Sequence, residues 1–394
     1  MFKKYFALVI AAVILLTPFL GHAQTVSKHG RVCSIAKTGG LASCHIQVLL
    51  DANNSPLVSA SPAGYTPAQL RGAYGVSGHA ASQPIIAIVD AYNDPTIKKD
   101  LDAYSLQFHL PILPICKTTA AKSAVPCFQK INQTGGSATP AANGDWSMEM
   151  ALDVEASHAM CENCSLVLVE AKSPNTTNLL AAVDTAVKTS AVAISNSWGG
   201  PEYKGETKLD AHFKHNGIAF TFSSGDSGYG VQYPAASPYV TAVGGTSLYM
   251  NGNSYRNEDA WSGAGSGCSQ YETKPAWQKD AMCKGRMVAD VSAVADPATG
   301  AAIYSSTSPN GQKGWFTAGG TSLAAPIIAA IYALGGLPKN QSANSLPYSL
   351  GNKNNLHDVV GGNNGSCGSS YLCAGKTKYD GPTGLGTPKG TGAF

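Results

Sequence analysis

Near-continuous apolar runs alternate with helical patterns along most of this 394-residue chain. Five apolar runs have the length of buried strands, at residues 84–90, 165–169, 191–195, 218–222 and 239–243. Helical patterns occupy residues 66–74, 146–160, 178–188 and 326–334. Buried strands that are separated by helices predict an α/β fold, with a parallel central sheet and helices on both of its faces.

Polar residues follow three of these predicted strands. Asp90 ends the first run, residues 197–199 follow the third, and residues 225–227 follow the fourth. The carboxyl ends of parallel strands meet at one edge of a sheet, and functional groups collect there in folds of this kind. We therefore expect the candidate chemistry at this edge.

The N-terminal part of the chain differs from the rest. Two lysines precede an apolar stretch over residues 5–16, and small residues end the pattern. It predicts a secretory signal peptide over residues 1–23, so the protein is expected to be secreted and extracellular, with the periplasm as the alternative. Residues 24–65 are rich in Ser, Ala and Pro and are interpreted as a short pro-segment or N-terminal arm. Residues 66–394 then form a single large domain.

Composition and charge narrow the choice of partners. A formal net charge of +3 offers no electrostatic case for nucleic acid. No other apolar run is long enough to cross a bilayer, so we expect no membrane association once the signal is cleaved. We also expect a monomer, although the sequence carries no signal of oligomeric state. Charged residues make up only 13% of the chain, which leaves few ion pairs to lose on acidification and weakly favours an acidic workplace.

The ten cysteines fall in neighbouring couples. In a secreted chain this pattern favours five short-loop disulfides. A redox or zinc half-site at 161–164 is the alternative, but a second Cys-x-x-Cys and a histidine pair at zinc spacing are both missing from the sequence. The expected pairs are Cys33–Cys44, Cys116–Cys127, Cys161–Cys164, Cys268–Cys283 and Cys367–Cys373.

A serine follows two glycines and a threonine directly before the apolar helical run at 326–334. The N-terminus of a helix carries unpaired N–H groups and a partial positive charge, which favour developing negative charge. The glycines permit a tight turn and close approach of a substrate backbone. Ser322 therefore fits a nucleophile, although Thr321 or Ser322 could instead simply cap a core helix.

Two carboxylates lie one turn apart on the predicted helix at 146–160. Glu149 and Asp153 are four residues apart and share one face of that helix, whereas His158 falls roughly opposite Glu149. Their neighbours are largely apolar, and burial would make two such charges costly. The pair therefore suggests chemistry, with a solvated helix face as the simpler alternative.

These motifs together resemble the subtilisin-like serine peptidases and, among them, the sedolisins or serine-carboxyl peptidases. Gly-Thr-Ser at 320–322 is similar to the signature around the nucleophile. Residues 146–155 resemble the Glu-x-x-x-Asp helix of sedolisins, and residues 194–200 resemble their Ser-Trp-Gly strand end. Residues 223–228 and 233–246 are similar to further sedolisin stretches. The matches run in family order over most of the chain.

The resemblance implies a subtilisin-like fold and a role for each matching residue. Ser322 would be the nucleophile, Glu149 the general base and acid, and Asp153 the group that orients Glu149. Asp226 would occupy the oxyanion site. A carboxylate with a pKa of about 4.3 is a weak base at neutral pH but well poised in acid, and Asp226 can donate a hydrogen bond only when it is protonated.

Further positions are implied with less detail. Asp90 resembles an acidic position at the end of an early strand and would extend the carboxylate network behind Glu149. Trp198 and Gly199 resemble the edge that lines the substrate groove. Many sedolisins also carry a large folded pro-domain, for which there is no room before residue 66, so either none is needed or a separate chain supplies it.

Two C-terminal stretches, 356–360 and 374–386, resemble the calcium site of sedolisins and imply one structural calcium ion. Calcium binds several oxygens that mix carboxylates with backbone carbonyls. The family usually has glycine where this chain has two lysines, and two loop aspartates in ordinary turns are the alternative. The implied ligands are the side chains of Asp358 and Asp380 and the carbonyls of Val359, Lys376 and Lys378.

We therefore expect an acid-active endopeptidase that cleaves protein or peptide substrates through an acyl-enzyme on Ser322. One alternative is a subtilisin-type enzyme with an unrecognised histidine base. The other is a secreted binding protein on an inactive peptidase scaffold.

Overall fold

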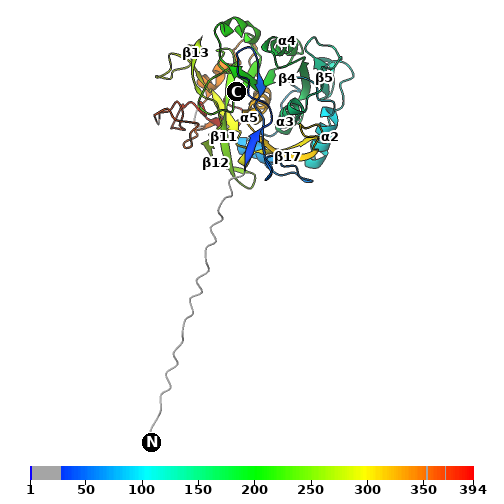
Figure 1. The fold of residues 1–394 in the computed structure, drawn as a ribbon, viewed down its shortest axis with the longest axis horizontal. Coiled ribbons are helices and arrows are strands. Elements are labelled where there is room, and N and C mark those ends of the chain that lie inside the picture. Colours follow the sequence, from blue (N-terminus) through cyan, green and yellow to red (C-terminus); the bar gives the residue numbers. More distant parts are fainter. Residues whose placement is uncertain (2–27, 352–353, 369) are drawn as a thin grey trace.

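A central sheet organises the molecule. The computed structural model describes residues 1, 28–351, 354–368 and 370–394, so the predicted signal peptide lies, but for Met1, outside the described residues. In this described part an eight-stranded sheet has the order β12-β11-β9-β7-β4-β6-β5, with β15 paired to β11 (Figure 1). All its pairs are parallel except β11 with β12. Its strands are β4 (Ile85–Ala91), β5 (Phe128–Asn132), β6 (Ser165–Ala171), β7 (Ala193–Asn196), β9 (Ala219–Ser223), β11 (Thr241–Asn251), β12 (Ser254–Ala260) and β15 (Val291–Val294).

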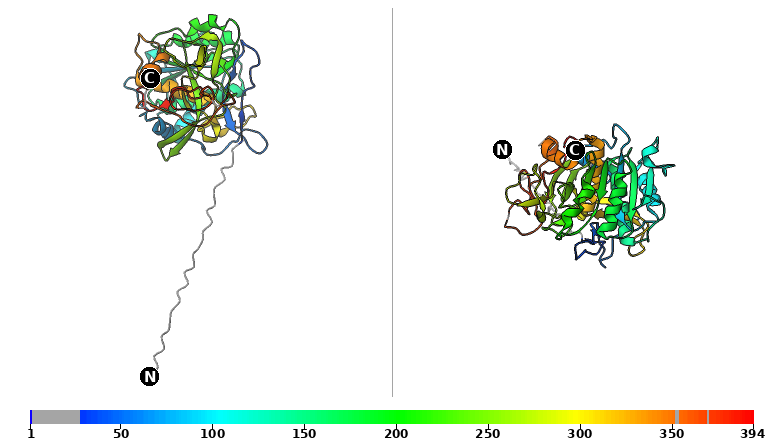
Figure 2. Two further views of the ribbon diagram at one scale, coloured as in Figure 1. Left: turned by 90° about the vertical axis from the view of Figure 1, so that its left-hand side faces the viewer. Right: turned by 90° about the horizontal axis from the view of Figure 1, so that it is seen from above.

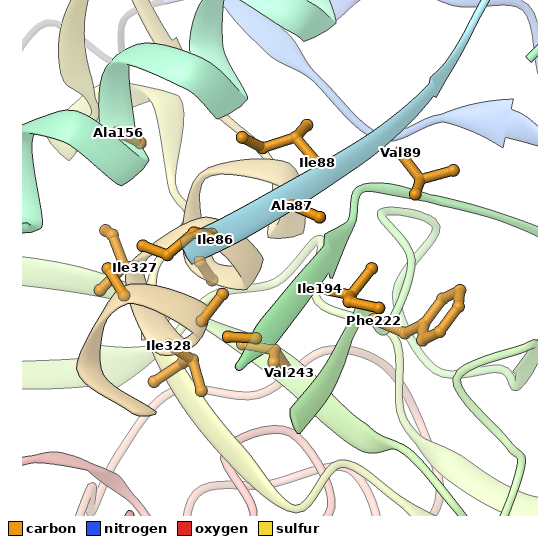
Figure 3. Packing of buried hydrophobic residues seen from close by; sticks show 14 of the residues in the cluster. Ile86, Ala87, Ile88, Val89, Ala156, Ile194, Phe222, Val243, Ile327 and Ile328 are labelled. Carbon is orange, nitrogen blue, oxygen red and sulfur yellow. The ribbon is translucent and has the colours of Figure 1, made fainter. Parts of the chain in front are cut away.

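Helices cover both faces of this sheet, as expected from the alternation of apolar runs. Helix α3 (Gly144–Met160) packs against α5 (Thr321–Gly335), and β4 lies between these two helices and α4 (Thr176–Val187) (Figure 1). Figure 3 shows Ile86 of β4 beside Ile327 of α5 inside the core. The remaining helices are α1 (Pro67–Tyr74), α2 (Ile97–Phe108), α6 (Leu346–Leu350), and the 3-10 turns η1 (Ala120–Lys122), η2 (Glu206–Phe213), η3 (Pro297–Thr299) and η4 (Ala343–Ser345).

Short antiparallel sheets join the N-terminal segment to the domain. One has the order β1-β3-β17-β16 and another β10-β8-β2, so residues 29–49 pair with two different parts of the fold (Figure 2). The strands are β1 (His29–Arg31), β2 (Ser43–Cys44), β3 (Gln47–Leu49), β8 (Trp198–Pro201), β10 (Gln232–Tyr233), β16 (Ala301–Ser305) and β17 (Gly314–Gly319). Two further pairs are β13 (Gly267–Thr273) with β14 (Gly285–Val288) and β18 (Leu356–His357) with β19 (Thr387–Pro388).

The five predicted disulfides are confirmed, each closing a loop of 3 to 15 residues. The zinc half-site alternative at Cys161–Cys164 is wrong, because these two cysteines are bonded to each other and leave no thiolate free to bind a metal. No helix among the described residues is both long and apolar enough to cross a bilayer.

A group of partly or fully buried carboxyl groups lies around Tyr233. Burial and the neighbouring carboxylates raise the pKa of Glu206 to about 8 and that of Glu272 to about 9. Burial also raises the pKa of Glu202 and of Asp210, which accepts a hydrogen bond from the Tyr233 hydroxyl at 3.2 Å. These groups therefore stay protonated at pH values where exposed carboxyl groups are ionised.

Candidate active site

Ser322 is the second residue of α5, which begins at Thr321 and not at the predicted residue 326. Gly320 is the N-cap, with a φ of 89° that suits glycine, and no side chain caps the helix. The alternative that Thr321 or Ser322 serves as the cap is therefore wrong. Pro326 inside α5 cannot donate to the Ser322 carbonyl, which instead accepts a hydrogen bond from Ser197 Oγ at 3.2 Å.

Glu149 and Asp153 of α3 are fully buried, so the alternative of a solvated helix face is wrong. Burial raises the pKa of both carboxyl groups well above the usual range, and the Asp90 carboxylate raises both further. Asp90, the residue before the last of β4, lies in the same interior, where burial and the charge of Glu170 raise its own pKa to about 8. Asp153 Oδ1 accepts a hydrogen bond from Ser197 Oγ at 2.8 Å. The three carboxyl groups are thus coupled electrostatically.

The serine hydroxyl and Glu149 are neighbours. The Ser322 side chain acts on Glu149 as a hydrogen-bond donor that lowers its pKa, although the contact is not a well-aligned hydrogen bond. The better-aligned acceptor for Ser322 Oγ is the carbonyl oxygen of Ser197, at 3.5 Å. Catalytic hydrogen bonds are commonly long before the transition state, so this geometry is compatible with proton transfer to Glu149.

Asp226 lies beside the first turn of α5. It follows β9, and its Oδ1 accepts hydrogen bonds from the backbone N–H and the hydroxyl of Thr321 at 2.8 and 2.7 Å. Its Oδ2 accepts one from Gln47 Nε2 at 3.1 Å. Burial raises the pKa of Asp226 to about 6, although Arg31 and these hydrogen bonds act in the opposite direction. Below about pH 6 the carboxyl group therefore carries a proton that it can donate.

Histidines occupy other positions in the structure. His158 donates from Nε2 to the carbonyl of Pro111 at 2.8 Å, away from the buried carboxyl groups. His45 is near the site, but its two ring nitrogens are bonded to Ser223 Oγ at 2.6 Å and to Gln232 Oε1 at 2.8 Å. No histidine of the described chain is hydrogen-bonded to the candidate nucleophile, which leaves Glu149 as the base that the geometry offers.

The two groove residues have different positions. The indole of Trp198 is buried in the core and donates from Nε1 to the carbonyl of Val89 at 3.0 Å. Its backbone lies in β8 together with Gly199. There it pairs antiparallel with β2, with Cys44 opposite Trp198 and Ser43 opposite Gly199.

The sequence analysis missed the contribution of residues 43–49 to this site. Ile46 donates its backbone N–H to Glu149 Oε2 at 2.8 Å, and Gln47 holds Asp226. The short apolar run that starts at Ile46 could have been read as a strand. The position of this strand over the site could not have been predicted, because strand pairing between distant segments leaves no local signal in the sequence.

The predicted calcium ligands gather in the C-terminal loops. Asp358 accepts hydrogen bonds from the backbone N–H of Lys378 at 3.0 and 2.9 Å, and Asp380 accepts one from the N–H of Lys376 at 2.9 Å. Burial raises the pKa of Asp380 to about 7, and the Asp358 carboxylate raises it further. Lys378 has a φ of 70°, a conformation that favours glycine. Among the described residues, no three His, Cys, Asp or Glu side chains cluster at metal-binding distance.

Comparison with known proteins places this geometry in a family. The model of the subtilase family matches residues 133–344, more than half of the chain. Sedolisin of Pseudomonas sp. (strain 101) is 31% identical in an alignment of 294 residues that covers 62% of this chain and 47% of sedolisin. Kumamolisin of Bacillus sp. (strain MN-32) is 29% identical in an alignment of 387 residues that covers 84% of this chain and 63% of kumamolisin. The chain belongs to the subtilase family, as a sedolisin-type member.

A solved structure agrees with this assignment. Pseudomonas sedolisin, a serine-carboxyl proteinase complexed with two molecules of pseudo-iodotyrostatin, superposes with a TM-score of 0.67 at 26% identity. The match covers 84% of this chain and 96% of that one, so the subtilisin-like fold expected for this sedolisin-type chain is confirmed. The chain spans less than two thirds of the length of the curated relatives sedolisin and kumamolisin.

Proposed function

We propose that this sedolisin-type chain is a secreted, acid-active serine endopeptidase. The observation that carries the proposal is the buried cluster at the start of α5. There the Ser322 hydroxyl adjoins Glu149, and Asp226 lies beside the N-terminal turn of the same helix. The serine-carboxyl proteinase among the solved structures has the same fold, which further supports it. The substrates would be proteins or peptides.

In this proposal Glu149 acts first as base and then as acid. Ser322 Oγ attacks the carbonyl carbon of the substrate and passes its proton to Glu149, which accepts it in the ionised form. Asp153 and Asp90 are coupled to Glu149 and hold the protons when Glu149 is the ionised member of the group. The developing oxyanion is stabilised by protonated Asp226, a contribution of about 3–4 kcal/mol for a preorganised donor. Glu149 then protonates the leaving amine, and water hydrolyses the acyl-enzyme.

The pH profile tests this proposal. Above its pKa of about 6 Asp226 is ionised, so it can no longer donate to the oxyanion and repels it instead. We expect the rate of hydrolysis of an unfolded protein substrate to fall roughly tenfold per pH unit above about pH 6. In Asp226→Asn the amide donates at every pH, so we expect a lower maximum rate without this decline near pH 6. The measurement is kcat/KM against pH for both forms.

Two results would count against the proposal. One is a wild-type rate that keeps rising towards about pH 8, because that behaviour indicates an imidazole base. The other is an Asp226→Asn profile that falls as the wild-type profile does, since Asp226 would then not be the titrating donor.

Export to an oxidising compartment is part of the proposal. Five disulfides and no free cysteine among the described residues support a location outside the cytoplasm. We propose that the protein acts as a monomer, free of membrane and nucleic acid.

We also propose one structural calcium ion, held by Asp358, Asp380 and the carbonyls of Val359, Lys376 and Lys378. The donors fit calcium, because they are all oxygens and because Asp380 is a buried carboxyl group, whose pKa is raised by burial and, to a lesser degree, by the charge of Asp358. The side chains of both lysines are exposed, which leaves their carbonyls free of the ammonium groups. The ion would fix the C-terminal loops and take no part in the chemistry.

Chelation tests this site. At about pH 7 we expect EGTA to lower the melting temperature, since an ion at about 100 times its Kd stabilises the fold by about 2.7 kcal/mol. Asp358→Asn should melt at the lower temperature with or without EGTA. Asp102→Asn, at a surface carboxylate paired with Lys98, should respond as the wild type does. An unchanged wild-type melting temperature in EGTA would rule the ion out.

A further inference from the structure

Residues 43–49 cross the candidate active site in an extended conformation and are held on both sides of it. On one side β2 adds antiparallel to β8, and the N–H of His45 donates to the carbonyl of Ser197 at 3.2 Å. On the other side β3 pairs antiparallel with β17, where Gln47 lies opposite Gly319. Addition of a strand to an open edge is the usual way in which an extended peptide is recognised.

One peptide bond of this segment lies on the reacting groups. A Cβ placed on Gly320 would be 1.9 Å from the carbonyl oxygen of His45 and 2.7 Å from Asp226 Oδ2, so both oxygens meet over this glycine. The N–H of Ile46 donates to Glu149 Oε2 at 2.8 Å. The carbonyl oxygen thus lies near the candidate oxyanion donor, and the adjoining N–H is hydrogen-bonded to the candidate acid.

The side chain that precedes this bond has its own pocket. The imidazole of His45 is buried and held by Ser223 and Gln232, and a Cβ on Gly199 would be 3.1 Å from its Cε1. The pocket therefore accepts an uncharged, hydrogen-bonding side chain. Together these contacts give the segment three features of a bound substrate, namely a paired backbone, a filled side-chain pocket and a peptide bond beside Glu149 and Asp226, the groups that flank the candidate nucleophile.

We propose that residues 43–49 are a built-in substrate that closes the groove, and that the enzyme opens it by cutting its own His45–Ile46 bond. This inference rests on the proposed peptidase function. It assigns a processing site inside the region 24–65 and makes the full chain a self-inhibited form, because Ser322 and Glu149 are fully buried while the segment is in place.

The cleavage follows the chemistry of the proposed enzyme and consumes one water molecule. Ser322 Oγ bonds to the His45 carbonyl carbon, and its proton passes through Glu149 to the nitrogen of Ile46 as the C–N bond breaks. Water then hydrolyses the ester, which restores Ser322 and leaves a carboxylate on His45. Ile46 becomes the new N-terminus of the domain.

Acid would loosen the segment before or after the cut. Burial lowers the pKa of His45 from 6.5 to about 3, with Arg31 acting in the same direction. Between about pH 6.5 and 3 the imidazole of His45 is therefore protonated when the segment is released but neutral when the segment is bound. Binding of the segment to the groove weakens as the pH falls through this window. Ser223 and Gln232, which hold the ring, do not titrate. Along the rest of the segment, Glu149 faces Ile46 and Asp226 faces Gln47.

The experiment compares the wild-type chain with Ser322→Ala, both purified at about pH 7 and then shifted to about pH 4. We expect N-terminal sequencing and intact mass to show Ile46 as the new first residue of the wild type only, together with the onset of hydrolysis of an unfolded protein substrate. Active wild type that keeps residues 43–49, or that begins at another residue, would overturn the inference and leave the proposed function intact. A wild type that never hydrolyses the substrate would overturn both.

A pair of histidine variants separates substrate-like binding from general proteolysis of a loose arm. His45→Ala loses both side-chain hydrogen bonds in the pocket, so we expect the Ile46 N-terminus to form at least about tenfold more slowly. His79→Ala changes an exposed histidine elsewhere and should process at the wild-type rate. Equal rates in the two variants would contradict the assignment of the pocket.

Discussion

Replacement of the Ser322 hydroxyl by hydrogen is expected to abolish hydrolysis of unfolded protein, with kcat reduced by about 10⁴–10⁶-fold. The reason is that no other nucleophile of the described chain stands both at the start of α5 and beside Glu149. The substitution Ser322→Ala removes a single atom from a buried residue, so the fold should persist. The measurement is kcat/KM at about pH 4, with circular dichroism as the check on folding.

A matched control makes this result specific. Ser77→Ala removes the same atom from an exposed loop residue and should leave kcat/KM unchanged. Hydrolysis by Ser322→Ala within about tenfold of the wild type would contradict the acyl-enzyme mechanism. The same result would also exclude the alternative of a binding protein on an inactive peptidase scaffold, because the chain would then hydrolyse protein from another site.

The second large effect is expected for Glu149→Gln. The amide keeps the shape of the side chain but cannot take the proton of Ser322, so we expect a loss of about 10²–10⁴-fold in kcat. Added to Ser322→Ala, the substitution should cost almost nothing further, because residues that act as a unit are not additive. Glu155→Gln on the same helix is the control, since that buried carboxyl bonds the backbone of Tyr304 and should not affect the rate.

Glu149→Gln also has a predicted effect on stability. Burial holds the pKa of Glu149 well above its ordinary value of 4.5. A group with a raised pKa stabilises the fold fully below the unfolded value, and this contribution is lost as the pH rises through the folded value. The Gln variant should therefore melt above the wild type at neutral pH, with a smaller difference in acid. A variant that melts far below the wild type at all pH values would assign Glu149 a structural role instead.

The sequence predicted the framework because its elements depend on local patterns. The strand expected at 84–90 is β4 (Ile85–Ala91), and the helix expected at 146–160 is α3 (Gly144–Met160). The motifs also led to Glu149 and Ser322, which the structure brings together through the packing of α3 on α5. Motif order thus identified a juxtaposition that periodicity alone could not.

The sequence-based predictions were wrong where contacts between distant segments determine the local structure. The start of α5 was placed too late because Pro326 looks like a first helical position. The helix begins at Thr321, after its N-cap Gly320, and Ser197 donates to the carbonyl that the proline leaves free. The segment at 43–49 was seen as an arm, because its strands of two and three residues depend on β8 and β17 for their pairing. His45 was overlooked for the same reason.

The carboxyl groups around Tyr233 set an upper limit on the pH at which this protein stays folded. Glu206 and Glu272 hold their protons until the solution is mildly alkaline, at pKa values of about 8 and 9. Because these pKa values are raised, protonation of the carboxyl groups favours the folded state. In alkaline solution the groups ionise, and several negative charges then repel one another inside the fold. We therefore expect this protein to unfold irreversibly in alkaline solution, whereas most globular proteins unfold in acid.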